Sequence, residues 1–139
     1  MPMEVEQVAQ ACAREFGITF AVMRGKRRDR RAMEARYMAA HICLTEVHRY
    51  RLWEAKQAQG EHSGYWVASR AIHRHIEDEL AELIDKDYTS IRWFYDRACE
   101  SLDEDEEFRK KRAAIMAELA QQNEAESESG IEAETEAAE

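Results

Sequence analysis

Scarcity of turn-forming residues constrains the fold of this chain more than any other feature of its sequence. Its 139 residues include five glycines and a single proline, Pro2. Hairpins between strands depend on glycine, proline and asparagine in their turns, whereas Ala, Glu, Arg, Leu and Met, which are abundant here, favour helices. We therefore predict an all-α fold, and the length suits one domain with a modest core rather than a large multidomain enzyme.

Apolar residues recur at steps of three and four along most of the chain, which is the spacing that buries one face of a helix. This spacing predicts helices over about 4–16, 19–24, 31–58, 65–84, 89–100 and 102–122. We expect a break near Glu77, and Ser101-x-x-Glu104 is typical of a capping box that opens the last helix. Residues 24–31, here called the basic loop, and residues 59–64 are the predicted loops.

Charge is distributed unevenly along the chain. The formal net charge is −9, of which −7 comes from seven Glu in residues 123–139, a segment without Lys or Arg. This acidic tail has Ile131 as its one large apolar residue and cannot offset its ordering entropy, so we predict disorder over 123–139. The tail is interpreted as a solubilising end, as a contact for a basic partner such as a polymerase-associated factor, or as an anionic shield for the basic surface over 24–36.

The basic loop and the residues after it carry the opposite charge. Residues 24–37 hold seven basic side chains against Asp29 and Glu34, a local charge of +5. A solvated helix end could also be basic, but this density favours a phosphate-binding surface, because the cations would repel one another without an anionic partner. The five most crowded are Lys26, Arg27, Arg28, Arg30 and Arg31.

Two of the predicted helices, joined by a tight turn, form a candidate helix-turn-helix over about 79–100. The start of the second helix of such a motif enters the major groove and needs side chains that hydrogen-bond to bases or phosphates. Arg92, farther along, can reach the DNA backbone. The residues at the start of the helix have the required character, although they also suit a plain helix cap: Asp87, Tyr88, Thr89 and Ser90.

Four sequence blocks resemble the C-terminal DNA-binding domain of the bacterial replication initiator DnaA. They are Val8-Ala9 to Phe16-Gly17-Ile18, the run 26–31, Arg36-Tyr37-Met38-Ala39 and Lys86-Asp87-Tyr88-Thr89-Ser90-Ile91, which together cover residues 5–39 and 76–100. The resemblance implies a small helical domain with a helix-turn-helix, similar to that of Trp repressor. Tyr88 stands where the family usually has histidine and Asp85 where it usually has glycine, and a helical segment over about 40–71 is inserted.

Roles in DNA binding follow from the same resemblance. It implies that Arg28 enters the minor groove from the basic loop and that Lys86 stands for the family's arginine. It also implies that Asp87, Tyr88 and Thr89 read the major groove, with Ser90 beside them. Because a phenol replaces the usual imidazole at Tyr88, we expect a different recognised sequence. The DNA-binding set that we predict is Lys26, Arg27, Arg28, Arg30, Arg31, Arg36, Lys86, Asp87, Tyr88, Thr89, Ser90 and Arg92.

The predicted function is sequence-specific binding of double-stranded DNA by a helical domain over residues 1–122. Free-standing copies of this domain resemble regulators of phage-like and gene-transfer-agent genes, which implies a transcriptional activator with RNA polymerase or a sigma-like factor as a further partner. Two alternatives are a phage or plasmid replication accessory that marks an origin, and an adaptor whose basic loop meets an acidic protein. The oligomeric state is left open.

Other functions are not expected from these residues. His73 and His75 lie on different faces of a helix, and the sequence offers no assembled nucleophile, base or metal set, so we predict no enzyme, cofactor or metal. The cysteines, without a C-x-x-C pair, are interpreted as reduced packing residues. No stretch approaches the ~20 apolar residues of a membrane span, and no signal-peptide core is present, so we expect a cytoplasmic protein. Trp93-Phe94-Tyr95 is assigned to the core rather than to a stacking platform for single strands.

Overall fold

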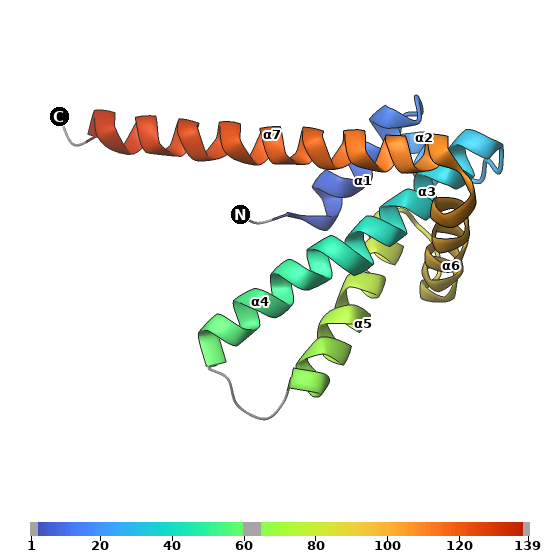
Figure 1. Cartoon of the computed structure of the whole chain (residues 1–139), viewed down its shortest axis with the longest axis horizontal. Coiled ribbons are helices and arrows are strands. Elements are labelled where there is room, and N and C mark those ends of the chain that lie inside the picture. Colours follow the sequence, from blue (N-terminus) through green and yellow to red (C-terminus); the bar gives the residue numbers. More distant parts are fainter. Residues whose placement is uncertain (1–2, 60–64, 138–139) are drawn as a thin grey trace.

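The chain forms helices throughout the part that the structure describes, and the prediction of an all-α fold is confirmed (Figure 1). This computed structural model describes the backbone of residues 3–59 and 65–137, and the side chains within these ranges except those of 59, 65–67 and 126–137. No strand occurs in these ranges. The elements are α1 (Val5–Glu15), α2 (Phe20–Arg24), α3 (Arg30–Ile42), the π-helix η1 (Cys43–Val47), α4 (His48–Gln59), α5 (Tyr65–Leu83), α6 (Tyr88–Glu104) and α7 (Glu106–Ala137).

One apolar core joins α1, α3, α5, α6 and α7. Helix α3 packs on α6 on one side and on α1 on the other, while α7 lies across α1. The interior is built from aliphatic side chains and three aromatic rings, Phe16, Phe94 and Phe108, and the centroids of Phe16 and Phe108 are 6.1 Å apart. Its fully buried members include Val5, Val8, Met23, Met38, Ile42, Ile76, Leu80, Ile84, Ile91, Ile115 and Leu119.

Helix α3 continues without a gap through the π-helix η1 into α4. The hydroxyl of Thr45 donates to the carbonyl of His41 at 2.7 Å, so a side chain competes for a backbone acceptor where the helix widens. The continuation, α4, packs against α5, and Figure 1 shows this pair projecting from the body of the molecule. The inserted segment predicted over about 40–71 thus contributes the end of α3, η1, α4 and the start of α5.

Two predicted helix boundaries are wrong. Helix α5 runs through Glu77 without a break. The carboxylate of Glu77 is fully buried and paired with Arg92 at 2.6 Å, so its charge is accommodated within the packed helix. Ser101 lies inside α6 and does not cap the last helix. Asp105 does so instead, since its Oδ1 accepts hydrogen bonds from the amides of Glu107 at 3.0 Å and Phe108 at 3.4 Å.

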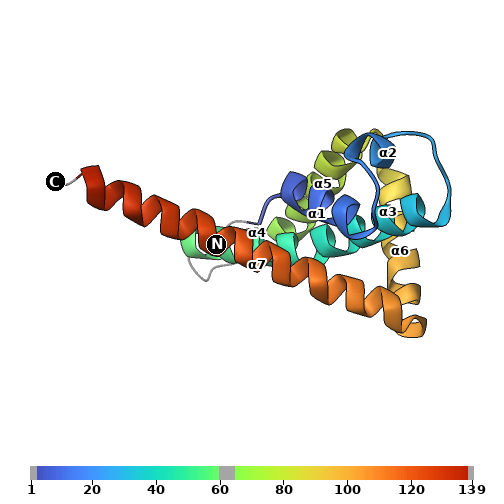
Figure 2. The same cartoon turned by 90° about the horizontal axis from the view of Figure 1, so that it is seen from above.

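Helix α7 continues well past the expected end of the packed domain. Asn123 is still buried and its Oδ1 accepts a hydrogen bond from Gln7 at 3.3 Å. The prediction of a disordered tail over 123–139 is not confirmed, because the backbone stays helical to Ala137, as its many Ala and Glu residues favour once a packed helix precedes them. Figures 1 and 2 place the far end of α7 opposite to the basic loop, so a helical tail does not shield that loop within one chain.

Replacing Asp105 by Ala tests the position of the helix cap. We expect Asp105→Ala to lower the free energy of unfolding by about 1 kcal/mol, because two amides at the start of α7 lose their acceptor. Urea denaturation followed by circular dichroism measures the change. The matched variant Ser101→Ala should alter the stability by less than about 0.5 kcal/mol. A larger loss in the Ser101 variant than in the Asp105 variant would contradict the observed cap.

Candidate nucleic-acid interface

The basic loop is held in place by the buried guanidinium of Arg36, which lies on α3 and is 2% exposed. Its nitrogen atoms donate to four main-chain carbonyls at 2.6–3.0 Å and to the sulfur of Met33 at 3.2 Å. The four carbonyls belong to Val22, Met23, Gly25 and Arg27. One side chain thus binds backbone carbonyls of both α2 and the basic loop. All of its N–H donors are used in this way, so none is left for DNA.

Lys86 joins the basic loop to the turn between α5 and α6. Its Nζ donates to the carbonyls of Gly25 at 2.8 Å and Arg24 at 2.9 Å, and it also lies 3.3 Å from the carbonyls of Ile84 and Asp85. Burial lowers the pKa of Lys86, and the nearby charge of Arg36 lowers it further. Like Arg36, this predicted DNA contact has become a structural cation whose hydrogen bonds are used within the chain.

The turn itself has an unusual backbone conformation. Asp85 has a φ of +56°, in the left-handed region that favours glycine, and the amide of Lys86 reaches back to the carbonyl of Ala81 at 2.8 Å. Asp87 then caps α6, since its Oδ1 accepts from the amide of Thr89 at 3.3 Å. Asp87 therefore acts as the helix cap that the sequence also allowed. The hydroxyl-bearing Thr89 next to it is exposed.

An open cavity of about 540 Å³ separates the basic loop from the start of α6. Cations from both sides line it, and its apolar wall is made by Met33, Trp93 and Phe94. Asp85 is the carboxylate in the lining. Five members of the predicted DNA-binding set meet here, and they are Lys26, Arg28, Arg36, Lys86 and Ser90.

The predicted cations differ in how free they are. Lys26, Arg28 and Arg31 are exposed and form no ion pair with any residue that the structure describes. Arg27 is paired with Asp29 at 2.8 Å, and Arg92 with Glu77. Both ends of the basic loop are helical: Arg24 is the last residue of α2, and Arg30 and Arg31 are the first residues of α3.

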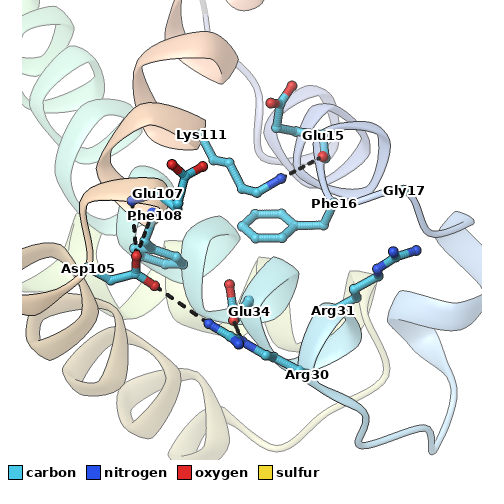
Figure 3. A pocket seen from close by; sticks show the side chains of 10 residues that line it. All are labelled: Glu15, Phe16, Gly17, Arg30, Arg31, Glu34, Asp105, Glu107, Phe108 and Lys111. Carbon is cyan, nitrogen blue, oxygen red and sulfur yellow. Dashed lines mark hydrogen bonds and ion pairs between the residues drawn. The ribbon is translucent and has the colours of Figure 1, made fainter.

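Arg30 and Arg31 belong to a different cavity, of about 460 Å³, near the start of α7. Figure 3 shows Arg30 reaching Glu34 and Asp105, with Asp105 3.8 Å away, whereas Arg31 extends along the other side. Three cations, Arg30, Arg31 and Lys111, face four carboxylates here, so the charges are compensated. The structure therefore divides the predicted basic cluster between two cavities, and only the cavity next to α6 keeps an excess of positive charge.

Tyr88 also lies away from the cavity next to α6. Its ring is stacked by the guanidinium of Arg74 from α5 at 3.9 Å, and Arg92 lies 5.2 Å from its centroid. These cation–π contacts direct the phenol toward α5. The proposed base reader Tyr88 is thus held on the α5 side of α6, while Ser90 lies on the loop side.

Two residues of this region were missed by sequence reasoning. Trp93 is 48% exposed and lines the cavity, so its assignment to the core is wrong, whereas Phe94 beside it is buried as predicted. Three-residue aromatic runs do not tell which ring faces outward, since this depends on how α6 rotates against α3. Glu77 was missed for the same reason, because only the packing of α6 on α5 reveals its buried ion pair with Arg92.

Other kinds of site are not formed by the residues that can be described. Within residues 3–59 and 65–137 no group of three or more His, Cys, Asp and Glu side chains is arranged to hold a metal ion. Burial raises the pKa of the Cys12 and Cys43 thiols far above the ordinary value, which disfavours the nucleophilic thiolate. No helix in these ranges is long and apolar enough to cross a membrane. Comparisons with protein-family models, curated proteins and solved structures find no match to this chain.

Replacing Arg36 by Lys tests its role in the basic loop. An ammonium has three donors on a narrow tip and cannot bond all four carbonyls, so Arg36→Lys should lower the free energy of unfolding by about 2 kcal/mol or more. It should also speed native-state cleavage by trypsin within 24–31. Arg31→Lys, an exposed substitution on the same helix, is the control and should change stability by less than about 0.5 kcal/mol. Equal stability of the two variants would contradict the assigned role.

Proposed function

We propose that this protein binds double-stranded DNA sequence-specifically, with the basic loop in the minor groove and the start of α6 in the major groove. The observation that carries the proposal is the placement of Lys26 and Arg28. Both are exposed and unpaired within the described part of the chain, and both line one cavity with residues of α6. Phosphate is the anion that such a surface meets along a duplex.

Rigidity of the loop supports this proposal. Arg36 and Lys86 use their hydrogen bonds to tie the loop to α2, α3 and the turn, so the free cations are presented from a fixed backbone. A preorganised loop loses less conformational entropy on binding than a mobile one. The free cations belong to the loop, because Lys86 in the turn is bound to loop carbonyls and its neighbours Asp85 and Asp87 are exposed carboxylates.

Readout of bases is assigned to the first turn of α6. Thr89 is exposed there, and its hydroxyl and methyl groups can contact base edges and the methyl of thymine. Asp85, with its left-handed backbone, lies where the initiator family usually has glycine, which agrees with a turn of the same shape. Because Tyr88 is stacked by Arg74, we assign it to positioning α6 on α5 and give Thr89 and Ser90 the principal contacts.

The biological role that we propose is that of a cytoplasmic transcriptional activator of phage-like or gene-transfer-agent genes, with RNA polymerase or a sigma-like factor as its partner. This role depends on the resemblance to the initiator domain and on the DNA binding proposed above. A replication accessory would use the same duplex contacts and differ in the genomic position of its sites. An interaction adaptor would show no salt-dependent binding of duplex.

The experiment that tests DNA binding is enrichment of duplexes from a random-sequence library at near-physiological salt. Wild type should enrich a defined motif, and Arg28→Ala should lose the A·T-rich flank that a minor-groove arginine prefers. Arg49→Ala removes the same charge from α4, where Arg49 is exposed and paired with Glu46, and should leave the motif unchanged. No enrichment by wild type would overturn the proposal and favour the adaptor. Genomic matches at promoters or at an origin would separate the two DNA-binding roles.

Salt dependence separates phosphate contacts from base contacts. Each phosphate that Lys26 or Arg28 neutralises contributes about 0.9 to the slope of log affinity against log salt, so Lys26→Ala should weaken binding to every duplex and flatten the slope by about that amount. Thr89→Ala should instead cost about 1–3 kcal/mol at one base pair and leave the slope unchanged. Fluorescence anisotropy with specific and random duplexes measures both. Equal losses on the two duplexes in the Thr89 variant would remove its role in readout.

A further inference from the structure

An exposed indole lies next to free cations in the cavity beside α6. Trp93 is 48% exposed, and it is held from behind by Tyr37, whose ring meets the indole edge to face at a centroid distance of 5.7 Å. The guanidinium of Arg97 lies 5.5 Å from the indole centroid. Both neighbours fix the orientation of the ring, so it is a preorganised aromatic surface rather than a loose side chain.

The lining of this cavity combines two chemistries. Lys26 and Arg28 supply positive charge and form no ion pair with a described carboxylate, and Arg36 and Lys86 add charge against the single carboxylate in the lining, Asp85. Met33, Trp93 and Phe94 supply an apolar and aromatic wall. A ligand that satisfies both must carry an anion and a flat ring, and a volume of about 540 Å³ lies within the ~300–1,000 Å³ typical of small-molecule sites.

We propose that this cavity binds an unpaired nucleotide of a single strand, with its phosphate at Lys26 and Arg28 and its base stacked on Trp93. Bases in an intact duplex are already stacked on their neighbours and cannot cover the indole. Aromatic side chains beside a cationic groove are the usual platform for single strands, and stacking tolerates any base because each has a π-face. The inference goes beyond duplex binding: it shares the loop cations with the proposed function but assigns Trp93 to the single-stranded form alone.

The surrounding surface favours a strand over a free nucleotide. Arg97 lies one helical turn beyond Trp93 on α6 and is exposed, with an ion pair to Glu100 at 3.1 Å. Arg31, which lines the neighbouring cavity, is exposed at the start of α3, so further cations lie on both sides of Lys26 and Arg28. Successive phosphates of a strand can meet these cations, whereas a mononucleotide offers one phosphate only. The ligand that we infer is therefore a short single strand of DNA or RNA, represented in the test by oligothymidylate.

The test measures binding of a labelled eight-nucleotide oligothymidylate and of a duplex by fluorescence anisotropy at ~150 mM salt. Trp93→Leu keeps an apolar side chain without a ring and should weaken single-strand binding at least 5-fold, which is the lower end of the loss of one base–aromatic stack. Trp93→Phe should restore part of the affinity. Trp53→Leu is the matched control, because Trp53 is the other large apolar residue that is exposed among the described side chains, at 56%, and lies on α4. It should bind both ligands as wild type does.

Several results would overturn the inference. They are wild-type affinity of Trp93→Leu for the oligothymidylate, an equal loss in Trp53→Leu, or a loss on the duplex as large as that on the single strand. If thymidine monophosphate competes with an affinity equal to that of the oligothymidylate, the cavity binds free nucleotides instead. Circular dichroism checks the fold of each variant, and Trp93→Phe keeps the comparison valid if Trp93→Leu unfolds.

The measurements with the two ligands distinguish a failure of the single-strand site from a failure of duplex binding. Binding of the duplex without binding of the oligothymidylate would overturn the single-strand site and leave the proposed function standing. Binding of the oligothymidylate without the duplex would do the reverse. Lys26→Ala should weaken both ligands, since both need the loop cations.

Discussion

The buried guanidinium of Arg36 is the interaction on which the functional surface depends. It binds carbonyls from the end of α2 and from the basic loop and so fixes both to α3, next to a surface crowded with positive charge. Burial lowers the pKa of Arg36, with the nearby charge of Arg28 acting in the same direction. Bonds to four carbonyls offset these costs, because carbonyl oxygens bring the partial negative charge that a buried cation needs.

The basic loop holds cations of like charge close together on a fixed backbone. Lys26 and Arg28 cannot move far apart to relieve their repulsion, since Arg36 and Lys86 hold the backbone on either side. An anion that enters the cavity relieves this repulsion and also meets a surface whose conformational entropy is already lost. The same frame positions Trp93, because α3, which carries Arg36, is the helix on which α6 packs. Charge and aromatic surface are therefore placed by one contact between α3 and α6.

Except at the end of α7, helix positions were predictable from the sequence to within a few residues, but the roles of individual polar residues were not. The spacing of Val5, Val8 and Cys12 requires a helix in any compact fold, since only that period buries all three. Capping is less certain, because Ser101 and Asp105 both suit a cap and the choice depends on where α6 stops against α7. Arg36 and Lys86 were predicted as DNA contacts, and the structure uses both to hold the loop.

Composition and spacing along the chain were enough to show that this protein is helical, that its excess positive charge is concentrated over residues 24–37 and that its excess negative charge lies over 123–139. These properties depend on composition and on spacing along the chain, which folding does not change. The packing of the helices is needed to tell which cations are free, which are bound to carbonyls, and that Trp93 faces outward beside Lys26 and Arg28. The reason is physical: a cation's availability depends on the acceptors within about 3 Å of it, and these come from segments distant in sequence.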